Sequence, residues 1–156
     1  MCDKQQSFSL TEAQKKLEHY CSYQERCHQE VQAKLKTLGM IPAACDIIIS
    51  QLIQENYLNE TRFAQSFARG KFRIKKWGKV RIRKELKARQ ISDYNIKIGL
   101  KEIKEADYNI TFWSLFEKRK EAVKAFSVAV QKKKILSYLM YRGWETQKIY
   151  AALQDL

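Results

Sequence analysis

The sequence has little glycine and proline, which excludes several kinds of structure. Five glycines and one proline occur in 156 residues, so we expect neither long coil segments nor proline-rich linkers. Neither N-G nor D-G, the dipeptides typical of tight β-hairpins, occurs anywhere in the chain. No apolar run approaches the ~18 residues of a membrane-spanning helix, and residues 1–10 lack the basic-then-apolar order of a signal peptide. We therefore expect a cytoplasmic protein without a membrane partner.

Residue types that bind metals or perform catalysis are also scarce or scattered. The two histidines, His19 and His28, lie near two cysteines, but their spacing does not match the usual zinc-ligand patterns. Because thiols stay reduced in the cytosol, the four cysteines do not predict a disulfide framework (Cys2, Cys21, Cys27 and Cys45). The chain has no glycine-rich phosphate loop and no cluster of carboxylates of the kind found in two-metal nucleases. The sequence predicts no enzyme, no cofactor, no metal site and no catalytic residue.

Helix start and stop signals recur along the chain at short intervals. Ser9 and Ser22 each stand three residues before a glutamate, in the pattern of a capping box. Asn59 and Ser92 are suitable N-caps for later helices. Apolar residues at helical spacing follow these positions. The pattern predicts about nine helices and no strands, with the second helix running from Ser22 to Gly39.

A self-similar pattern emerges when the chain is compared with itself at offsets of 51 and then 53 residues. Apolar residues and a turn position stay in register over ~22 residues. Seven columns align: Val31 with Ile82 and Ile135, Leu35 with Leu86 and Leu139, Gly39 with Gln90 and Gly143, Met40 with Ile91 and Trp144, Cys45 with Ile96 and Ile149, Ile49 with Leu100 and Leu153, and Leu52 with Ile103 and Leu156. Any two amphipathic helices align apolar to apolar, but that alone does not keep a turn and both flanking helices in register.

The repeat predicts the fold class and the division of the chain. We expect an all-α fold of three tandem three-helix repeats that form an elongated, curved array, because units in such an array contact mainly their neighbours. The expected units span residues 9–56, 57–106 and 107–156.

The charge is strongly positive and is concentrated in one segment. The chain holds 30 Lys and Arg against 17 Asp and Glu, a net charge of +13. Residues 69–89 hold eleven cations and one acid, Glu85, interleaved with Phe72, Trp77 and two glycines. Such a segment is typical of nucleic-acid binding, because cations displace counterions, glycines allow close approach and rings stack on bases. We predict that ten of these cations bind nucleic acid: Arg69, Lys71, Arg73, Lys75, Lys76, Lys79, Arg81, Arg83, Lys84 and Lys87.

Other interpretations of the basic residues remain open at this level. A run of charge is more often a solvated helix face, although such faces normally mix both signs and this segment does not. Phe72 and Trp77 either stack on bases or pack in the core. Lys124 and the run from Lys132 to Lys134 form a second, weaker basic group that would extend the binding track.

Two stretches of the chain resemble motifs of the RecX family of bacterial recombination regulators. The closing motif of that family is similar to Tyr141-Arg142-Gly143-Trp144. Its central motif resembles Tyr57-Leu58-Asn59-Glu60-x-Arg62-Phe63-Ala64, then Phe67-x-Arg69, then Gly78, Ile82, Leu86 and Ile91. The chain departs from the family pattern at Asn59, where Asp is common, and at Gln90, where Gly is usual in the turn. The resemblance spans nearly the whole chain.

The resemblance implies a fold, a partner and a function. The fold is three tandem three-helix repeats. The implied function is to bind the RecA recombinase filament on DNA, to lie in its helical groove, and to restrain strand exchange and ATP hydrolysis. We accordingly expect a monomer that contacts single- and double-stranded DNA without sequence specificity.

Two other function classes compete with this interpretation. Three-helix units superficially resemble helix-turn-helix modules, so a free-standing DNA-binding or transcription regulator is the main alternative; it would select one operator sequence and usually be a dimer. A membrane-surface protein with a basic amphipathic helix is less compatible with the sequence, because its apolar face is needed for the core and two glycines interrupt the cationic run.

Overall fold

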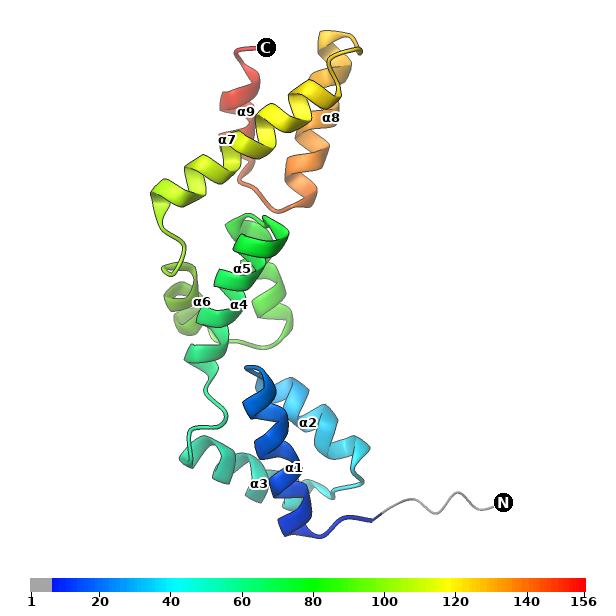
Figure 1. Cartoon of the computed structure of the whole chain (residues 1–156), viewed down its shortest axis with the longest axis vertical. Helices are drawn as coiled ribbons and strands as arrows, with labels where there is room; N and C mark the ends of the chain where they lie inside the picture. The colour runs from blue at the N-terminus through cyan, green and yellow to red at the C-terminus, as the bar shows by residue number, and fades with distance from the viewer. Residues whose placement is uncertain (1–6) are drawn as a thin grey trace, which may run out of the picture.

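The computed structural model describes residues 7–156, and Cys2 lies outside the described residues. These residues form helices and contain no strand (Figure 1). The helices are α1 (Leu10–Tyr23), α2 (His28–Thr37), α3 (Pro42–Gln54), α4 (Glu60–Lys75), α5 (Lys79–Ala88), α6 (Asp93–Leu100), α7 (Glu105–Ala122), α8 (Val128–Tyr141) and α9 (Thr146–Leu153). None of these helices is long and apolar enough to cross a membrane.

The helices pack in groups of three along the length of an elongated, curved molecule. We refer to α1–α3 as the first unit, α4–α6 as the second and α7–α9 as the third. Helices α1 and α9 lie toward opposite ends of the array (Figure 1). The helix-to-helix contacts are made mainly within each unit, so the units touch one another largely through turns. The predicted fold class, an all-α array of three-helix repeats, is confirmed.

Three of the predicted N-caps form as expected. The side-chain oxygen of Ser9 accepts a hydrogen bond from the Glu12 amide at 3.1 Å. Asn59 and Ser92 accept in the same way from the amides three residues on, at 2.9 and 3.2 Å. Each bond satisfies a backbone donor that the helix itself leaves unpaired.

The prediction that Ser22 begins the second helix is wrong. Ser22 lies in the last turn of α1, where its hydroxyl donates to the Glu18 carbonyl at 2.7 Å. The cap of α2 is Cys27, whose amide donates to the Glu30 carboxylate at 3.2 Å. Two consecutive helices without an intervening glycine or proline gave no stop signal in the sequence, and the helix end was therefore missed.

The turn after the second helix of each unit has the same geometry in all three units. Its central residue adopts a left-handed conformation, with φ values of 74°, 60° and 86° at Gly39, Gln90 and Gly143. The amide that follows donates to the carbonyl of the aligned leucine at 3.1 Å in each unit: Met40 to Leu35, Ile91 to Leu86, and Trp144 to Leu139. This 6→1 bond closes a helix whose last carbonyls would otherwise be unsatisfied. The residues aligned at the turn of the repeat therefore share a left-handed backbone conformation.

The columns beyond the turn hold less well in the first unit. Ile96 and Ile149 are fully buried, whereas the aligned Cys45 is only half-buried. The first unit buries Ile48, which is not a column residue, whereas Leu52 is buried like its aligned Ile103. Helix α3 has 13 residues against 8 in α6 and in α9, and only its last column residue is fully buried.

The apolar core is divided between two clusters. One cluster belongs to the first unit and includes Leu17, Leu35 and Leu52. The other runs continuously through the second and third units and includes Trp144. Cys27, at the start of α2, is fully buried in this second cluster. The second and third units thus share a core, while the first unit has its own.

The junction between the second and third units is a contact between two turns. The amides of Gly78 and Val80 donate to the carbonyls of Arg142 and Gly143, at 2.8 and 3.0 Å. A Cβ atom on Gly78 would lie 2.3 Å from the Gly143 oxygen, a distance that no side chain tolerates. The Trp144 indole donates to the Lys76 carbonyl at 3.2 Å. The backbones of the two units therefore meet directly.

The junction between the first and second units is built around an ion pair. The Arg62 Nε atom lies 2.5 Å from a Glu25 carboxylate oxygen. The Arg62 guanidinium also donates to the carbonyls of Asn56 and Tyr57, at 2.9 and 3.3 Å. The second Glu25 oxygen is buried and has no hydrogen-bond partner among residues 7–156. Arg62, part of the central motif, thus ties the linker and α1–α2 to α4.

Candidate nucleic-acid interface

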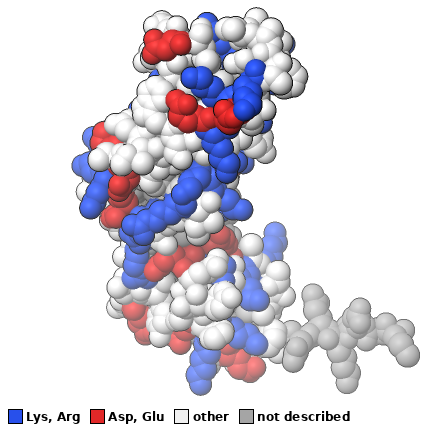
Figure 2. Space-filling model, turned by 45° about the horizontal axis from the view of Figure 1, so that its top comes forward, with Lys and Arg blue, Asp and Glu red and all other residues white. Residues whose placement is uncertain are grey.

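The basic segment, residues 69–89, comprises the end of α4 from Arg69 onward, a short turn and the whole of α5. Its apolar positions fall at helical spacing, and Phe72, Ile82 and Leu86 are buried, so the intervening cations point outward. Of the ten predicted binding residues, six are exposed and four are half-buried. The exposed ones are Arg73, Lys75, Lys76, Arg83, Lys84 and Lys87; the half-buried ones are Arg69, Lys71, Lys79 and Arg81. Figure 2 shows one face of the molecule, on which Lys and Arg side chains cover part of the middle, with Asp and Glu side chains gathered beside them.

Three of the ten predicted residues are paired with acids. The pairs are Arg69 with Glu102 at 3.2 Å, Lys79 with Glu105 at 3.3 Å, and Lys87 with Asp93 at 3.4 Å. Such surface pairs contribute about 0–1 kcal/mol, so a phosphate can replace the carboxylate at small cost.

The other seven have no carboxylate within 4.0 Å among the described residues. They are Lys71, Arg73, Lys75, Lys76, Arg81, Arg83 and Lys84. No carboxylate of the described residues compensates these charges, which favours binding of a polyanion by counterion release.

Half-buried aromatic rings hold several cations in place between α4 and α5. The Lys71 ammonium lies 5.5 Å from the Phe67 ring centre and 5.1 Å from that of Trp77. The Arg81 guanidinium lies 4.2 Å from the Trp77 ring, and that of Arg89 lies 4.8 Å from the Phe67 ring. Cation–π attraction holds these ammonium and guanidinium groups against the rings, so the cations are oriented before any ligand binds. Phe67 was missed as a site residue in the sequence, although it lies two residues before the basic segment and ten before Trp77.

The structure decides between the two interpretations of Phe72 and Trp77. Phe72 is buried in the core shared by the second and third units, with its ring centre 5.9 Å from that of Tyr108. Trp77 is half-buried against the same core, and Lys71 and Arg81 lie against its ring. Both rings pack within the protein, and neither is a free platform for a base.

The two glycines of the basic segment have different surroundings. Gly78 is buried against the backbone of the third unit, so the expectation that it admits a phosphate backbone is wrong. Gly70 lies within α4, and a Cβ atom there would meet nothing within 4 Å. Glycine inside a helix costs about 1 kcal/mol relative to alanine, and the chain's own packing does not require it at this position.

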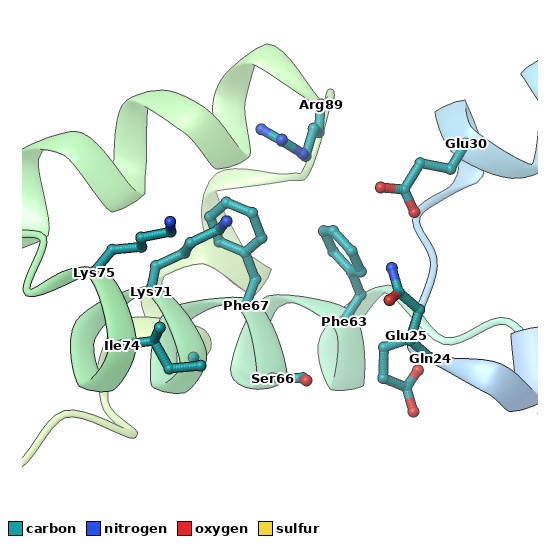
Figure 3. A pocket seen from close by; sticks show the side chains of 11 residues that line it. Gln24, Glu25, Glu30, Phe63, Ser66, Phe67, Lys71, Ile74, Lys75 and Arg89 are labelled. Carbon is teal, nitrogen blue, oxygen red and sulfur yellow. The ribbon is translucent and has the colours of Figure 1, made fainter.

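A groove of about 340 Å³ lies between the first and second units beside Gly70. Figure 3 shows Lys71 and Lys75 of α4 at one end, Glu25 and Glu30 of the first unit at the other, and Arg89 above the middle. Phe63 and Phe67 line the middle. The structure therefore brings two of the predicted residues together with Arg89, and it places acidic groups of the first unit at the opposite end.

The second basic group lies elsewhere. Lys132 and Lys133 border a separate groove of the third unit, between α8 and α9. The Lys134 ammonium lies 4.6 Å from the Phe126 ring centre, and Lys124 pairs with Glu121. Helix α8 packs on α7 and α9 rather than on the second unit.

Buried titratable groups near the junctions stay protonated at neutral pH. Burial raises the pKa of the Cys21 thiol to about 11 and also raises that of Cys27, which keeps thiolate, the reactive form, scarce. Burial and a hydrogen bond to Glu145 raise the pKa of the Tyr108 hydroxyl. That hydroxyl accepts from the Lys79 amide at 3.0 Å and donates to Glu145. The described residues contain no group of three or more His, Cys, Asp or Glu that could hold a metal ion.

Three comparisons relate this architecture to known proteins. Residues 59–100 match the sequence model of the second three-helix domain of RecX. Over 137 residues, 88% of the chain, it is 28% identical to the Regulatory protein RecX of Bacillus cytotoxicus and 26% identical to that of Bacillus mycoides. The aligned part covers 51% of each relative, so the chain spans about half the length of these proteins.

Solved structures share the fold. The crystal structure of RecX from Lactobacillus salivarius matches with a TM-score of 0.81 at 24% identity, covering 94% of this chain and 96% of that one. A crystal structure of regulatory protein RecX matches with a TM-score of 0.79 at 19% identity, covering 94% of this chain and 74% of that one. The comparisons confirm the resemblance carried by the sequence motifs: the chain is similar to regulatory proteins of the RecX family and shares the fold of the solved RecX structures.

Proposed function

We propose that this chain is a non-enzymatic regulator that binds the RecA recombinase filament on DNA and inhibits its recombinase and ATPase activities. The partner comes from the family resemblance, and the name of the relatives, regulatory protein, supports a regulatory rather than a catalytic role. The observation that carries the proposal is the surface of α4 and α5, where seven cations lie without an acid within 4.0 Å in the described chain. We expect it to act in the cytoplasm as a monomer.

The DNA contact proposed for this surface is not specific for sequence. Lysine and arginine side chains on phosphates fix the position of a protein but carry no information about bases. The aromatic rings of the segment pack within the protein, so they do not read bases. Single- and double-stranded DNA both present phosphates to the ten predicted residues, and we expect the chain to bind both.

The shape of the molecule supports a filament as the partner. An elongated, curved array offers a long surface that can follow a helical groove (Figure 1). The basic centre would reach phosphates between recombinase subunits while other faces touch protein. Occupation of the groove would exclude incoming duplex DNA or restrain the subunit motion coupled to ATP turnover. Inhibition requires tighter binding to the inhibited filament than to the active one.

Recombinase ATPase on single-stranded DNA, measured while this protein is titrated in, tests the proposal. We expect the ATPase rate and strand exchange to fall as the protein saturates the filament. Unchanged ATPase and strand exchange despite tight DNA binding would contradict the regulator hypothesis. Selection of one operator from random duplexes would instead favour a free-standing transcription regulator.

A further inference from the structure

A second cationic site lies in the first unit, away from the basic segment. A cleft of about 530 Å³ opens between α1 and α2. Among the described residues, no carboxylate lines it. Its walls carry four cations and two tyrosine rings: Lys15, Lys16, Arg26, Lys34, Tyr20 and Tyr23.

Helical spacing brings the cations of this site together, although the surrounding sequence carries charges of both signs. Residues 12–30 hold cations and acids in similar numbers. Lys15, His19 and Tyr23 are four residues apart and so share one face of α1. The opposite face of α1 buries Leu17 and Cys21. Folding therefore gathers the cations on one side of the helix pair.

The neighbouring acids do not neutralise the cleft. Glu18 accepts a hydrogen bond from the Gln14 amide group at 3.3 Å. Glu30 caps α2 at Cys27 and lines the groove between the first and second units instead. In the described part of the chain, none of the four cations of the cleft lies within 4.0 Å of a carboxylate.

The cleft is organised before any ligand binds. The Arg26 guanidinium lies 3.7 Å from the Tyr20 ring centre, and its Nε atom donates to the Tyr20 carbonyl at 3.1 Å. The Lys34 ammonium lies 5.7 Å from the same ring. Tyr23, at the end of α1, is 77% exposed. Fixed cations next to an uncovered ring are the elements that single-strand binding sites combine.

We propose that this cleft binds single-stranded nucleic acid, with phosphates at Lys15, Lys16, Arg26 and Lys34 and a base stacked on Tyr23. A single strand exposes the faces of its bases, whereas a duplex hides them in the helical stack. An acidic peptide would use the cations but has no need of an exposed ring. The proposal goes beyond the regulator function and does not depend on the α4–α5 surface, because the cleft belongs to a different unit with a separate core.

The test measures binding of the full chain to labelled oligo(dT) and to a duplex of equal length over a range of salt concentrations. Lys15→Gln, Lys16→Gln and Lys34→Gln together should lower the slope of log affinity against log salt for oligo(dT) by about 2, since each single-strand phosphate contact contributes about 0.7. Tyr23→Ala should weaken oligo(dT) binding by about fivefold or more. Tyr23→Phe, which keeps the ring, should restore it.

Matched controls separate local from general effects. Lys97→Gln, Lys101→Gln and Lys118→Gln remove the same charge from exposed positions outside the cleft, and Tyr94→Ala removes a ring that is 74% exposed on α6. If the cleft variants bind oligo(dT) no worse than these controls, the cleft is passive and the proposal fails. It also fails if polyglutamate displaces oligo(dT) from the cleft and Tyr23→Ala has no effect. If the α4–α5 surface did not bind DNA, the cleft variants would still weaken oligo(dT) binding relative to their controls. The two proposals can therefore fail independently of each other.

Discussion

The two junctions of the array are held together by different kinds of interaction. The second and third units meet through backbone atoms, with Gly78 and Gly143 in contact and a core that is continuous across them. The first and second units meet around the Arg62–Glu25 ion pair and the buried Cys27 side chain. Backbone contact in a packed core permits little adjustment, whereas a partly exposed ion pair contributes little energy. We therefore expect the second and third units to move as one body and the first unit to pivot on them.

The largest effect is expected at the contact between Gly78 and Gly143. In Gly78→Ala the added methyl group would meet the Gly143 carbonyl at 2.3 Å, and the two turns must separate. We expect the free energy of unfolding to fall by about 3 kcal/mol or more, measured by urea denaturation. The matched control is Gly70→Ala, where the added atom meets nothing and helix propensity should raise stability by up to about 1 kcal/mol. Equal stability of Gly78→Ala and the parent would disprove a close-packed junction.

A second prediction concerns the pH dependence of the core of the first unit. Burial raises the pKa of Cys21 from 9.0 to about 11 in the folded first unit. The folded state therefore holds this proton more tightly than the unfolded state, so its contribution is intact below pH 9 and is lost as the pH rises toward 11. We expect the first unit to lose about 2–3 kcal/mol across that window. Cys21→Ala should flatten the loss, while Cys45→Ala, at a half-buried position, should not; identical profiles for the two variants would contradict the prediction.

The smallest effect on stability is expected at the junction between the first and second units. Glu25→Gln removes the charge that holds Arg62, at a cost of about 1 kcal/mol or less. Arg62 also holds the carbonyls of Asn56 and Tyr57, so amides of residues 56–58 should exchange hydrogen faster. The amides of Gly78 and Val80 should keep their exchange rates, because they are bonded to the third unit. Faster exchange at both junctions would show that the array loosens as a whole.

Much of the fold was predictable because its signals are local. Ser9, Asn59 and Ser92 cap their helices through side chains only three residues from their partners. The aligned turn position of the repeat was visible because a left-handed backbone conformation favours glycine, as at Gly39 and Gly143. Gln90 shows that the repeat geometry can impose φ of 60° on another residue.

The site was predictable only in part, because its neighbours come from distant segments. The run of cations was evident, but Glu102 and Glu105, which pair with Arg69 and Lys79, follow about 30 residues later and gave no sequence signal. The close approach of Gly78 to Gly143 joins two units and could not be inferred from either turn alone. The cleft at Tyr23 was hidden because charges of both signs alternate along the chain there.

The central claim is that unpaired cations on α4 and α5 bind the phosphate backbone. The most direct test is the salt dependence of duplex binding for the parent and for a variant with Arg73→Gln, Lys75→Gln, Lys76→Gln and Arg83→Gln. Lys36→Gln, Lys97→Gln, Lys101→Gln and Lys118→Gln together form the charge-matched control at exposed positions. We expect the slope of log affinity against log salt to fall by about 3–4 in the α4–α5 variant, equally for unrelated DNA sequences. A slope that stays equal to that of the control would contradict the claim.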